Sequence, residues 1–163
     1  MCKALEYDES GKNIFQFLPR VVLITIIGFW TALRLGKIAT PIANQLAAPQ
    51  PFTSTLLTSF YNPLLKNLAA SLSSHESLLR EFNTSLLMLT RSDDLRTKRT
   101  ALESIEIIWE ELGDGMLGLV PETTPFLAES IEESEGGVEL VTRRLIKRIE
   151  NHLGETLEDF LST

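Results

Sequence analysis

This 163-residue chain has only two histidines and one cysteine, so it offers little for the acid–base or nucleophilic chemistry that those residues carry out at neutral pH. His75 and His152 each fall at an expected helix boundary, where a capping role or a charge that favours the helix dipole is the simpler reading. Cys2 is the single cysteine, which excludes an internal disulfide and any multi-cysteine zinc site. The chain also lacks the zinc-protease, phosphate-loop and serine-hydrolase motifs. We therefore expect no enzyme, no metal and no cofactor.

Acidic residues imitate metal-binding faces at two places. Glu103, Glu106 and Glu110 recur at i, i+3 and i+7, on the side of a predicted helix away from Ile105 and Ile108. A second group lies around an expected turn and comprises Glu129, Glu132, Glu133 and Glu135. A solvated face is the expected role of such runs, and a protein-docking surface is the alternative.

Four cations gather on one predicted helix, namely Arg143, Arg144, Lys147 and Arg148. They can pair with the acidic turn that precedes this helix, or they can contact RNA phosphates. No aromatic residue lies between the cations to stack on bases. The composition therefore favours an internal or protein-facing role for these four residues as a partner surface.

Two of the helices that must position these residues share a pattern of apolar residues that is repeated 41 residues later, here called the 41-residue echo. The spacing i, i+3, i+7 marks one helical face, and a glycine ends each helix. The matching positions are Ile105, Ile108, Leu112 and Gly113 in one stretch and Ile146, Ile149, Leu153 and Gly154 in the other. A period of about 40–47 residues built from helix pairs is typical of HEAT repeats. Leu65, Leu68 and Leu72 indicate a third repeat 40 residues earlier.

Apolar periodicity and turn residues predict the order of helices. We expect helices over 55–72 with a break at 62–63, over 76–90, over 95–112, from Thr124-Pro125 to about 131, and over 138–153. A further helix should start at Thr40-Pro41, and a short one should cover 156–161. The predicted fold is all-α, a HEAT-like helical-repeat solenoid at the C-terminal end of an array.

Charge and hydropathy divide the chain unevenly. The formal net charge is −7, yet no acidic residue occurs between Glu9 and Glu76, so the acidic residues gather in the C-terminal half. Val21 to Leu33 is an apolar run shorter than the roughly 20 residues that span a membrane. We expect a buried helix or strand there, with an insert or a membrane element as alternatives. The predicted domains are a divergent or misannotated segment, 1–54, whose apolar run covers 21–35, and helical repeats over 55–163.

The segment from Phe82 to Leu161 resembles the C-terminus of the U3 small nucleolar RNA-associated protein 10 family, called HEAT repeat-containing protein 1 in animals. The most specific match is the block LVPETTPFL, from Leu119 to Leu127, and the chain end LGETL, from Leu153 to Leu157, also matches. Family members are very long. The short chain, whose run from Val21 to Leu35 has no counterpart, is therefore expected to be a fragment or a mispredicted gene model.

This resemblance implies a nuclear, nucleolar scaffold of the small-subunit processome, the U3 ribonucleoprotein. It would act in pre-18S rRNA processing and ribosome biogenesis and support ribosomal DNA transcription. Its partners would be other processome proteins, with U3 RNA or pre-rRNA contacted indirectly or weakly, and neither a small-molecule substrate nor a membrane is expected. The alternatives are a generic HEAT or armadillo-type adaptor and a membrane-associated helical protein.

Within such repeats, Asp93 and Arg99 are the structural candidates. They lie six residues apart across the turn into the second helix of a pair. HEAT repeats commonly place an acid and an arginine at these positions, where they bridge neighbouring repeats. The last repeat has Ser134 and Leu140 at the matching offset, as expected of an atypical terminal repeat.

Overall fold

A computed structural model describes residues 31–45, 59, 61–133 and 135–157. The regular structure in these ranges is helical, and they contain no strand, so the predicted all-α helical-repeat fold is confirmed there. The chain forms two compact units, Met1–Phe82 and Asn83–Thr163. The predicted domain boundary at 54/55 falls outside the described residues and stays a prediction.

The first unit holds α2 (Ala32–Asn44), α4 (Asn62–Leu72) and the start of α5 (Glu76–Leu89). A hydrogen bond from the Tyr61 hydroxyl to the Ile42 carbonyl, 3.4 Å long, joins the start of α4 to α2. Three leucines of the suggested earlier repeat, Leu65, Leu68 and Leu72, are buried on α4. The spacing of these leucines therefore marks a buried helix face, as predicted.

Helix α2 corrects one predicted boundary. It begins at Ala32 and continues through Pro41, whereas the sequence predicted a helix start at Thr40-Pro41. Proline lacks the N–H that would bond four residues back. Leu35, Ala39 and Ile42 nevertheless form one buried face across the proline. We attribute the continuity to this packing, because buried faces contribute most of the stability of short helices.

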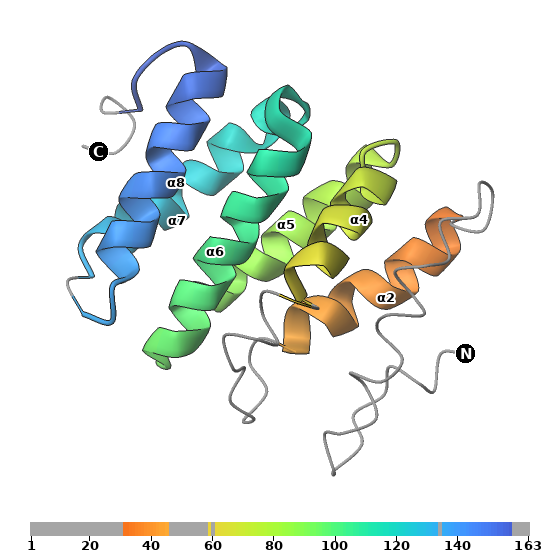
Figure 1. Ribbon diagram of the computed structural model, residues 1–163, viewed down its shortest axis with the longest axis horizontal. Coiled ribbons are helices and arrows are strands. Elements are labelled where there is room, and N and C mark those ends of the chain that lie inside the picture. Colours follow the sequence, from red (N-terminus) through yellow and green to blue (C-terminus); the bar gives the residue numbers. More distant parts are fainter. Residues whose placement is uncertain (1–30, 46–58, 60, 134, 158–163) are drawn as a thin grey trace. The chain divides into compact units, whose positions relative to one another are not determined.

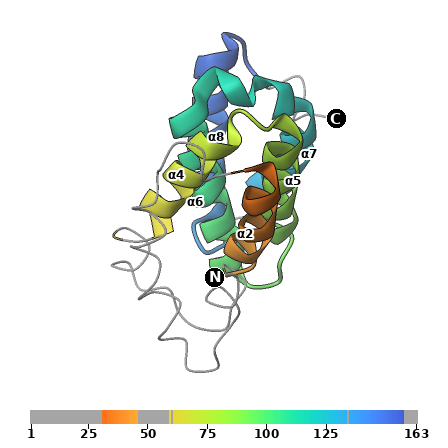
Figure 2. The same ribbon diagram turned by 90° about the vertical axis from the view of Figure 1, so that its right-hand side faces the viewer.

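The second unit holds the end of α5, followed by α6 (Leu95–Leu112), η4 (Gly113–Leu119), α7 (Val120–Ile131) and α8 (Val138–Leu153). Helices α6 and α8 lie side by side in one layer, and α7 lies with the C-terminal half of α5 in the other (Figures 1 and 2). The 41-residue echo is present in the structure: Ile105, Ile108 and Ile149 are fully buried, and Ile146 is nearly so. These equivalent faces form the core between the two layers.

Glycine ends both helices of the echo. Gly113 has φ +49° and Gly154 has φ +78°, conformations that L side chains rarely adopt. The Gly154 amide donates to the Glu150 carbonyl, which satisfies one of the last carbonyls of α8. The region from Gly113 to Leu119, for which the sequence predicted no helix, is the 3-10 helix η4.

Helix α7 begins earlier than predicted. Its first residue is Val120, with Pro121 in the first turn, and Pro125 lies inside the helix. Thr124, the predicted cap, instead donates its hydroxyl to the Val120 carbonyl at 2.8 Å. The proline that suits a helix start is therefore Pro121 and not Pro125.

No helix among the described residues combines the length and apolar character needed to cross a membrane. Most of the apolar run, residues 21–30, lies outside the described residues, so its predicted role is not tested. The predicted short helix over 156–161 is described only at Thr156 and Leu157, which are not helical.

Candidate partner-binding surface

The turn between α5 and α6 is fixed by Asp94. Its carboxylate accepts hydrogen bonds from the Arg96 amide at 3.2 Å and from the Thr97 hydroxyl at 2.6 Å, as an N-cap residue does. The bond from Thr97 is the largest cause that lowers the pKa of Asp94 below its ordinary value. The sequence predicted a turn here but did not identify Asp94 as the N-cap residue of α6.

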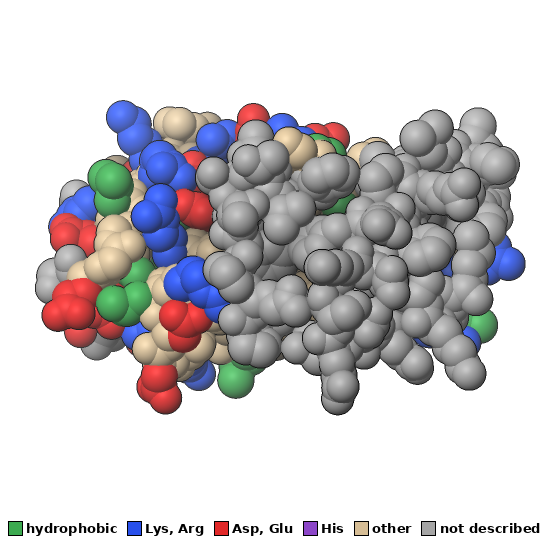
Figure 3. All heavy atoms as spheres, turned by 60° about the horizontal axis from the view of Figure 1, so that its bottom comes forward, with side chains coloured by type: hydrophobic (Ala, Val, Ile, Leu, Met, Phe, Trp, Pro, Cys, Tyr) green, Lys and Arg blue, Asp and Glu red, His purple; other side chains and the backbone are tan. Residues whose placement is uncertain are grey.

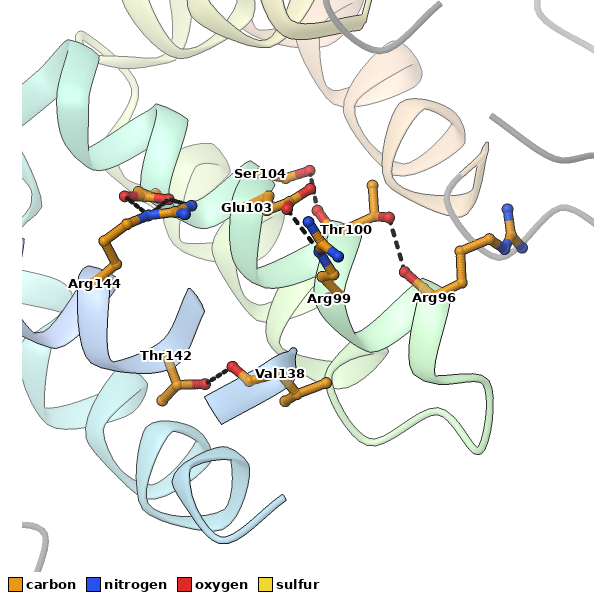
Figure 4. A network of polar contacts seen from close by, with 9 residues as sticks. Arg96, Arg99, Thr100, Glu103, Ser104, Val138, Thr142 and Arg144 are labelled. Atoms are coloured by element: carbon orange, nitrogen blue, oxygen red, sulfur yellow. Dashed lines mark hydrogen bonds and ion pairs between the residues drawn. The ribbon is translucent and has the colours of Figure 1, made fainter. Parts of the chain in front are cut away.

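The predicted inter-repeat pair is placed at this turn. Asp93 is exposed beside Asp94, and Arg99 lies on the second turn of α6. Arg99 Nε donates to Glu103 Oε1 at 2.9 Å along the same helix (Figure 4). The bridging of neighbouring repeats by Asp93 and Arg99 stays a prediction.

Arg144 and Arg148 converge on Glu106. Arg144 Nε donates to both carboxylate oxygens of Glu106, at 2.9 and 3.1 Å, and Arg148 Nη2 lies 3.6 Å from Oε1. The bonds to Glu106 raise the pKa of Arg144 above its ordinary value. Figure 4 shows the side chain of Arg144 reaching from α8 toward α6. These two cations therefore join the helices of one layer.

The prediction of a solvated acidic face on α6 is wrong for Glu106. Only 10% of its side chain is exposed, whereas the sequence predicted a solvated face for Glu103, Glu106 and Glu110. Glu103 is half-buried and Glu110 is exposed. Helical spacing places Glu106 away from Ile105, but the adjacent helix α8 covers that side as well.

Arg143 and Lys147 point to the outside of α8. Arg143 Nε donates to Glu139 Oε1 at 2.8 Å, in an exposed pair one turn apart. Lys147 is exposed, and its ammonium group forms no hydrogen bond or ion pair with any of the described residues. In the space-filling view, Lys and Arg side chains gather in a column on the surface of the second unit (Figure 3). The four predicted cations thus divide into an inner pair and an outer pair.

Among the described residues, the acidic turn forms no ion pair with the four cations of α8, contrary to one sequence interpretation. Glu129 accepts from Arg91 Nε at 2.7 Å, and Glu133 accepts from Lys98 Nζ at 2.9 Å. These bonds lower the pKa of both carboxyl groups below the ordinary value. The Arg91 guanidinium also lies 4.2 Å above the Phe126 ring. These bonds therefore join the C-terminal end of α7 and its following turn to the turn between α5 and α6 and to the first turn of α6.

The two histidines belong to different units and have different surroundings. The His75 carbonyl accepts from the Leu79 amide at the start of α5. His152 Nδ1 lies 2.9 Å from Asp114 Oδ1, and its ring packs at a centroid distance of 6.2 Å from Trp109. His152 thus connects the end of α8 to η4. The described residues hold no group of three or more His, Cys, Asp or Glu able to bind a metal ion.

Leu140 is an exposed apolar residue that the sequence interpretation did not assign to a surface. It lies on the outer side of α8 with 68% of its surface exposed. Its position three and seven residues before Arg143 and Lys147 places it on their helix face. The helical spacing was available in the sequence, but the exposure of that face requires the packing of α8.

Comparison with known proteins identifies the relatives of the chain. It is 32% identical over 172 residues to U3 small nucleolar RNA-associated protein 10 of Neosartorya fischeri, an alignment that covers 98% of this chain and 9% of the relative. The proteins of the same name from Aspergillus oryzae and Phaeosphaeria nodorum are 34% and 37% identical, and each alignment covers 82% of this chain and 8% of the relative. No family model matches the chain, and no solved structure matches it.

The chain spans about a tenth or less of the length of these curated relatives. The similarity extends beyond the C-terminal half on which the sequence resemblance rested and includes most of the first unit. The chain therefore belongs to the U3 small nucleolar RNA-associated protein 10 family and matches its C-terminal region.

Proposed function

We propose that this chain is a scaffold segment of the small-subunit processome, acting in nucleolar pre-18S rRNA processing and in support of ribosomal DNA transcription. The observation that carries the proposal is the similarity over nearly the whole chain to proteins named for their association with U3 small nucleolar RNA. That name describes an association and not a reaction. Nuclear and nucleolar localisation follows from the same proposal.

The fold supports a scaffold role in physical terms. Helical repeats expose long side faces whose residues are free to vary while the core stays constant. In the second unit, α6 and α8 present such a face, and their inward residues form the core. A rigid helical face of this kind is suited to holding partners in place.

The proposed partners are other processome proteins, with U3 RNA or pre-rRNA contacted indirectly or weakly. Two of the four cations on α8 are occupied by Glu106, and the chain as a whole carries a net charge of −7. Overall negative charge opposes binding to RNA phosphates. These charges favour protein contacts over direct RNA binding, and no small-molecule substrate or membrane is proposed.

The test is purification of the tagged chain from nuclear extract, with sequencing of bound RNA and mass spectrometry of bound proteins. Recovery of U3 RNA together with processome proteins is the expected result. The control is Ile108→Asp, which places a charge in a fully buried position and should unfold the second unit. A folded, well-expressed chain that recovers other proteins but neither U3 RNA nor processome proteins would instead indicate a general helical-repeat adaptor.

A further inference from the structure

We propose that the outer face of α8 binds an acidic, amphipathic helix of a protein partner. The face, here called the α8 ridge, consists of Leu140, Arg143, Lys147 and Asn151. The inference rests on the proposed scaffold function and names one docking surface for it.

Helix geometry brings these four residues together. Their spacing of i, i+3, i+7 and i+11 places them on one side of an α-helix, with about 5.4 Å between successive turns. The opposite side of α8 carries Val141, Leu145 and Ile149, which are buried in the core. The ridge is thus the outermost line of the helix, and all four of its residues are exposed.

The charges of the ridge are available to a partner. Among the described residues, Lys147 makes no hydrogen bond or ion pair, and the side chain of Arg143 pairs only with Glu139, one turn away in an exposed i, i+4 pair. Such exposed pairs contribute little free energy, so Arg143 can exchange Glu139 for a partner carboxylate at little cost. Arg144 flanks the ridge, but its guanidinium is held by Glu106. Carboxylates one turn apart on a partner helix would match Arg143 and Lys147.

Leu140 determines which kind of partner the ridge fits. A large exposed apolar residue beside cations suits the leucine or similar anchor of an amphipathic helix. It adds nothing to the binding of phosphates. The Trp109 ring of α6 is fully buried. The ring of α8, His152, lies against Trp109 and Asp114 and is not part of the ridge, so the ridge itself offers no ring for base stacking. The combination therefore favours an acidic helix over RNA.

The experiment uses the purified full chain and a fluorescein-labelled helical peptide that has glutamates one turn apart and a single leucine on the same face. A second peptide carries serine in place of that leucine, and a single-stranded RNA oligonucleotide tests the competing ligand. Fluorescence anisotropy gives the Kd of each. Circular dichroism verifies that every variant is folded.

We expect the leucine peptide to bind more tightly than the serine peptide and the RNA. Leu140→Ser and Arg143→Glu should each weaken its binding by about ten-fold or more. The chain offers matched controls: Leu33→Ser changes an equally exposed leucine on α2, and Arg80→Glu changes an arginine in an exposed i, i+4 pair with Glu76. Both controls should bind the peptide as the unchanged chain does.

Three results would overturn the inference. They are no binding of the peptide by the folded chain, equal losses in the control and ridge variants, or tighter binding of the RNA than of the peptide. None of these measurements involves a cellular component. A chain that recovers U3 RNA from extract but fails this test would therefore lose the docking surface and keep the proposed function.

Discussion

Arg144 of α8 binds Glu106 of α6 with its Nε atom 2.9 Å from one carboxylate oxygen and 3.1 Å from the other. The carboxylate is almost fully buried, whereas about half of the Arg144 side chain is exposed. A buried carboxylate needs such partners, because a charge removed from water without compensation is costly. This pair makes the packing of α8 on α6 dependent on charge as well as on the apolar core.

Removal of the charge from Glu106 should destabilise the second unit. We expect Glu106→Gln to lower the free energy of unfolding by about 1–2 kcal/mol, because Arg144 and Arg148 would lose their shared anion. Urea denaturation followed by circular dichroism measures the change. The matched control is Glu139→Gln, whose exposed pair with Arg143 should cost no more than about 0.5 kcal/mol. Equal losses of unfolding free energy in the two variants would show that the buried pair of Glu106 contributes no more than the exposed pair of Glu139.

A double-mutant cycle isolates the pair itself. Arg144→Met keeps the apolar stem of the side chain and removes its charge. We expect the combined Glu106→Gln, Arg144→Met variant to lose less than the sum of the single variants, with a coupling of about 1 kcal/mol. Additive losses would show that Glu106 and Arg144 act independently.

The two helix-ending glycines should differ in their tolerance of alanine. Both have positive φ, so alanine is strained at either position, at a cost of about 1–2 kcal/mol. At Gly113 the added Cβ would also lie 2.9 Å from His152 Cε1, whereas at Gly154 nothing lies within 4 Å. Gly113→Ala should therefore lower the melting temperature more than Gly154→Ala. The reverse order would show that the close approach of an added Cβ at position 113 to the His152 ring does not affect stability.

Acid should weaken the start of α6. The pKa of Asp94 is lowered in the folded chain, chiefly by the Thr97 hydroxyl and further by Arg96. Its stabilising effect is therefore present above the unfolded pKa of about 3.9 and is lost as the pH falls through the lower folded value. Asp94→Asn keeps an N-cap acceptor but cannot titrate.

The measurement is the difference in unfolding free energy between the unchanged chain and Asp94→Asn at several pH values. The difference should favour aspartate at neutral pH and diminish as the pH falls below about 4. A difference that stays constant over this range would show that the Asp94 charge does not contribute. The lowered pKa values of Glu129 and Glu133 act in both proteins and cancel.

The sequence predicted most of the C-terminal helices because their signals are local. Helices α6 and α8 begin and end at the predicted residues, because turn residues and glycines fix those ends: α6 covers Leu95–Leu112 and α8 covers Val138–Leu153. Two helix starts were predicted wrongly, because the sequence placed Pro41 and Pro125 in the first turn, whereas both lie inside their helices. Proline is a local signal, and it was overridden where a buried face continued across it.

The site was less predictable because it depends on contacts between helices. Periodicity along α6 cannot show that α8 covers Glu106, which is 38 residues away from its partner Arg144. The same contact decides which of the four cations on α8 are occupied and which face solvent. Leu140 was overlooked for the same reason, since the packing of α8 is what makes it an exposed leucine.

The decisive measurement for the proposed scaffold function is the amount of U3 RNA that the tagged, folded chain recovers from nuclear extract, relative to an unrelated small RNA of equal abundance. We expect the unchanged chain to enrich U3 RNA and Ile108→Asp to lose this enrichment, because Ile108 is fully buried in the core. Recovery of U3 RNA no better than that of the unrelated RNA, by a folded and well-expressed chain, would show that the proposed function is wrong.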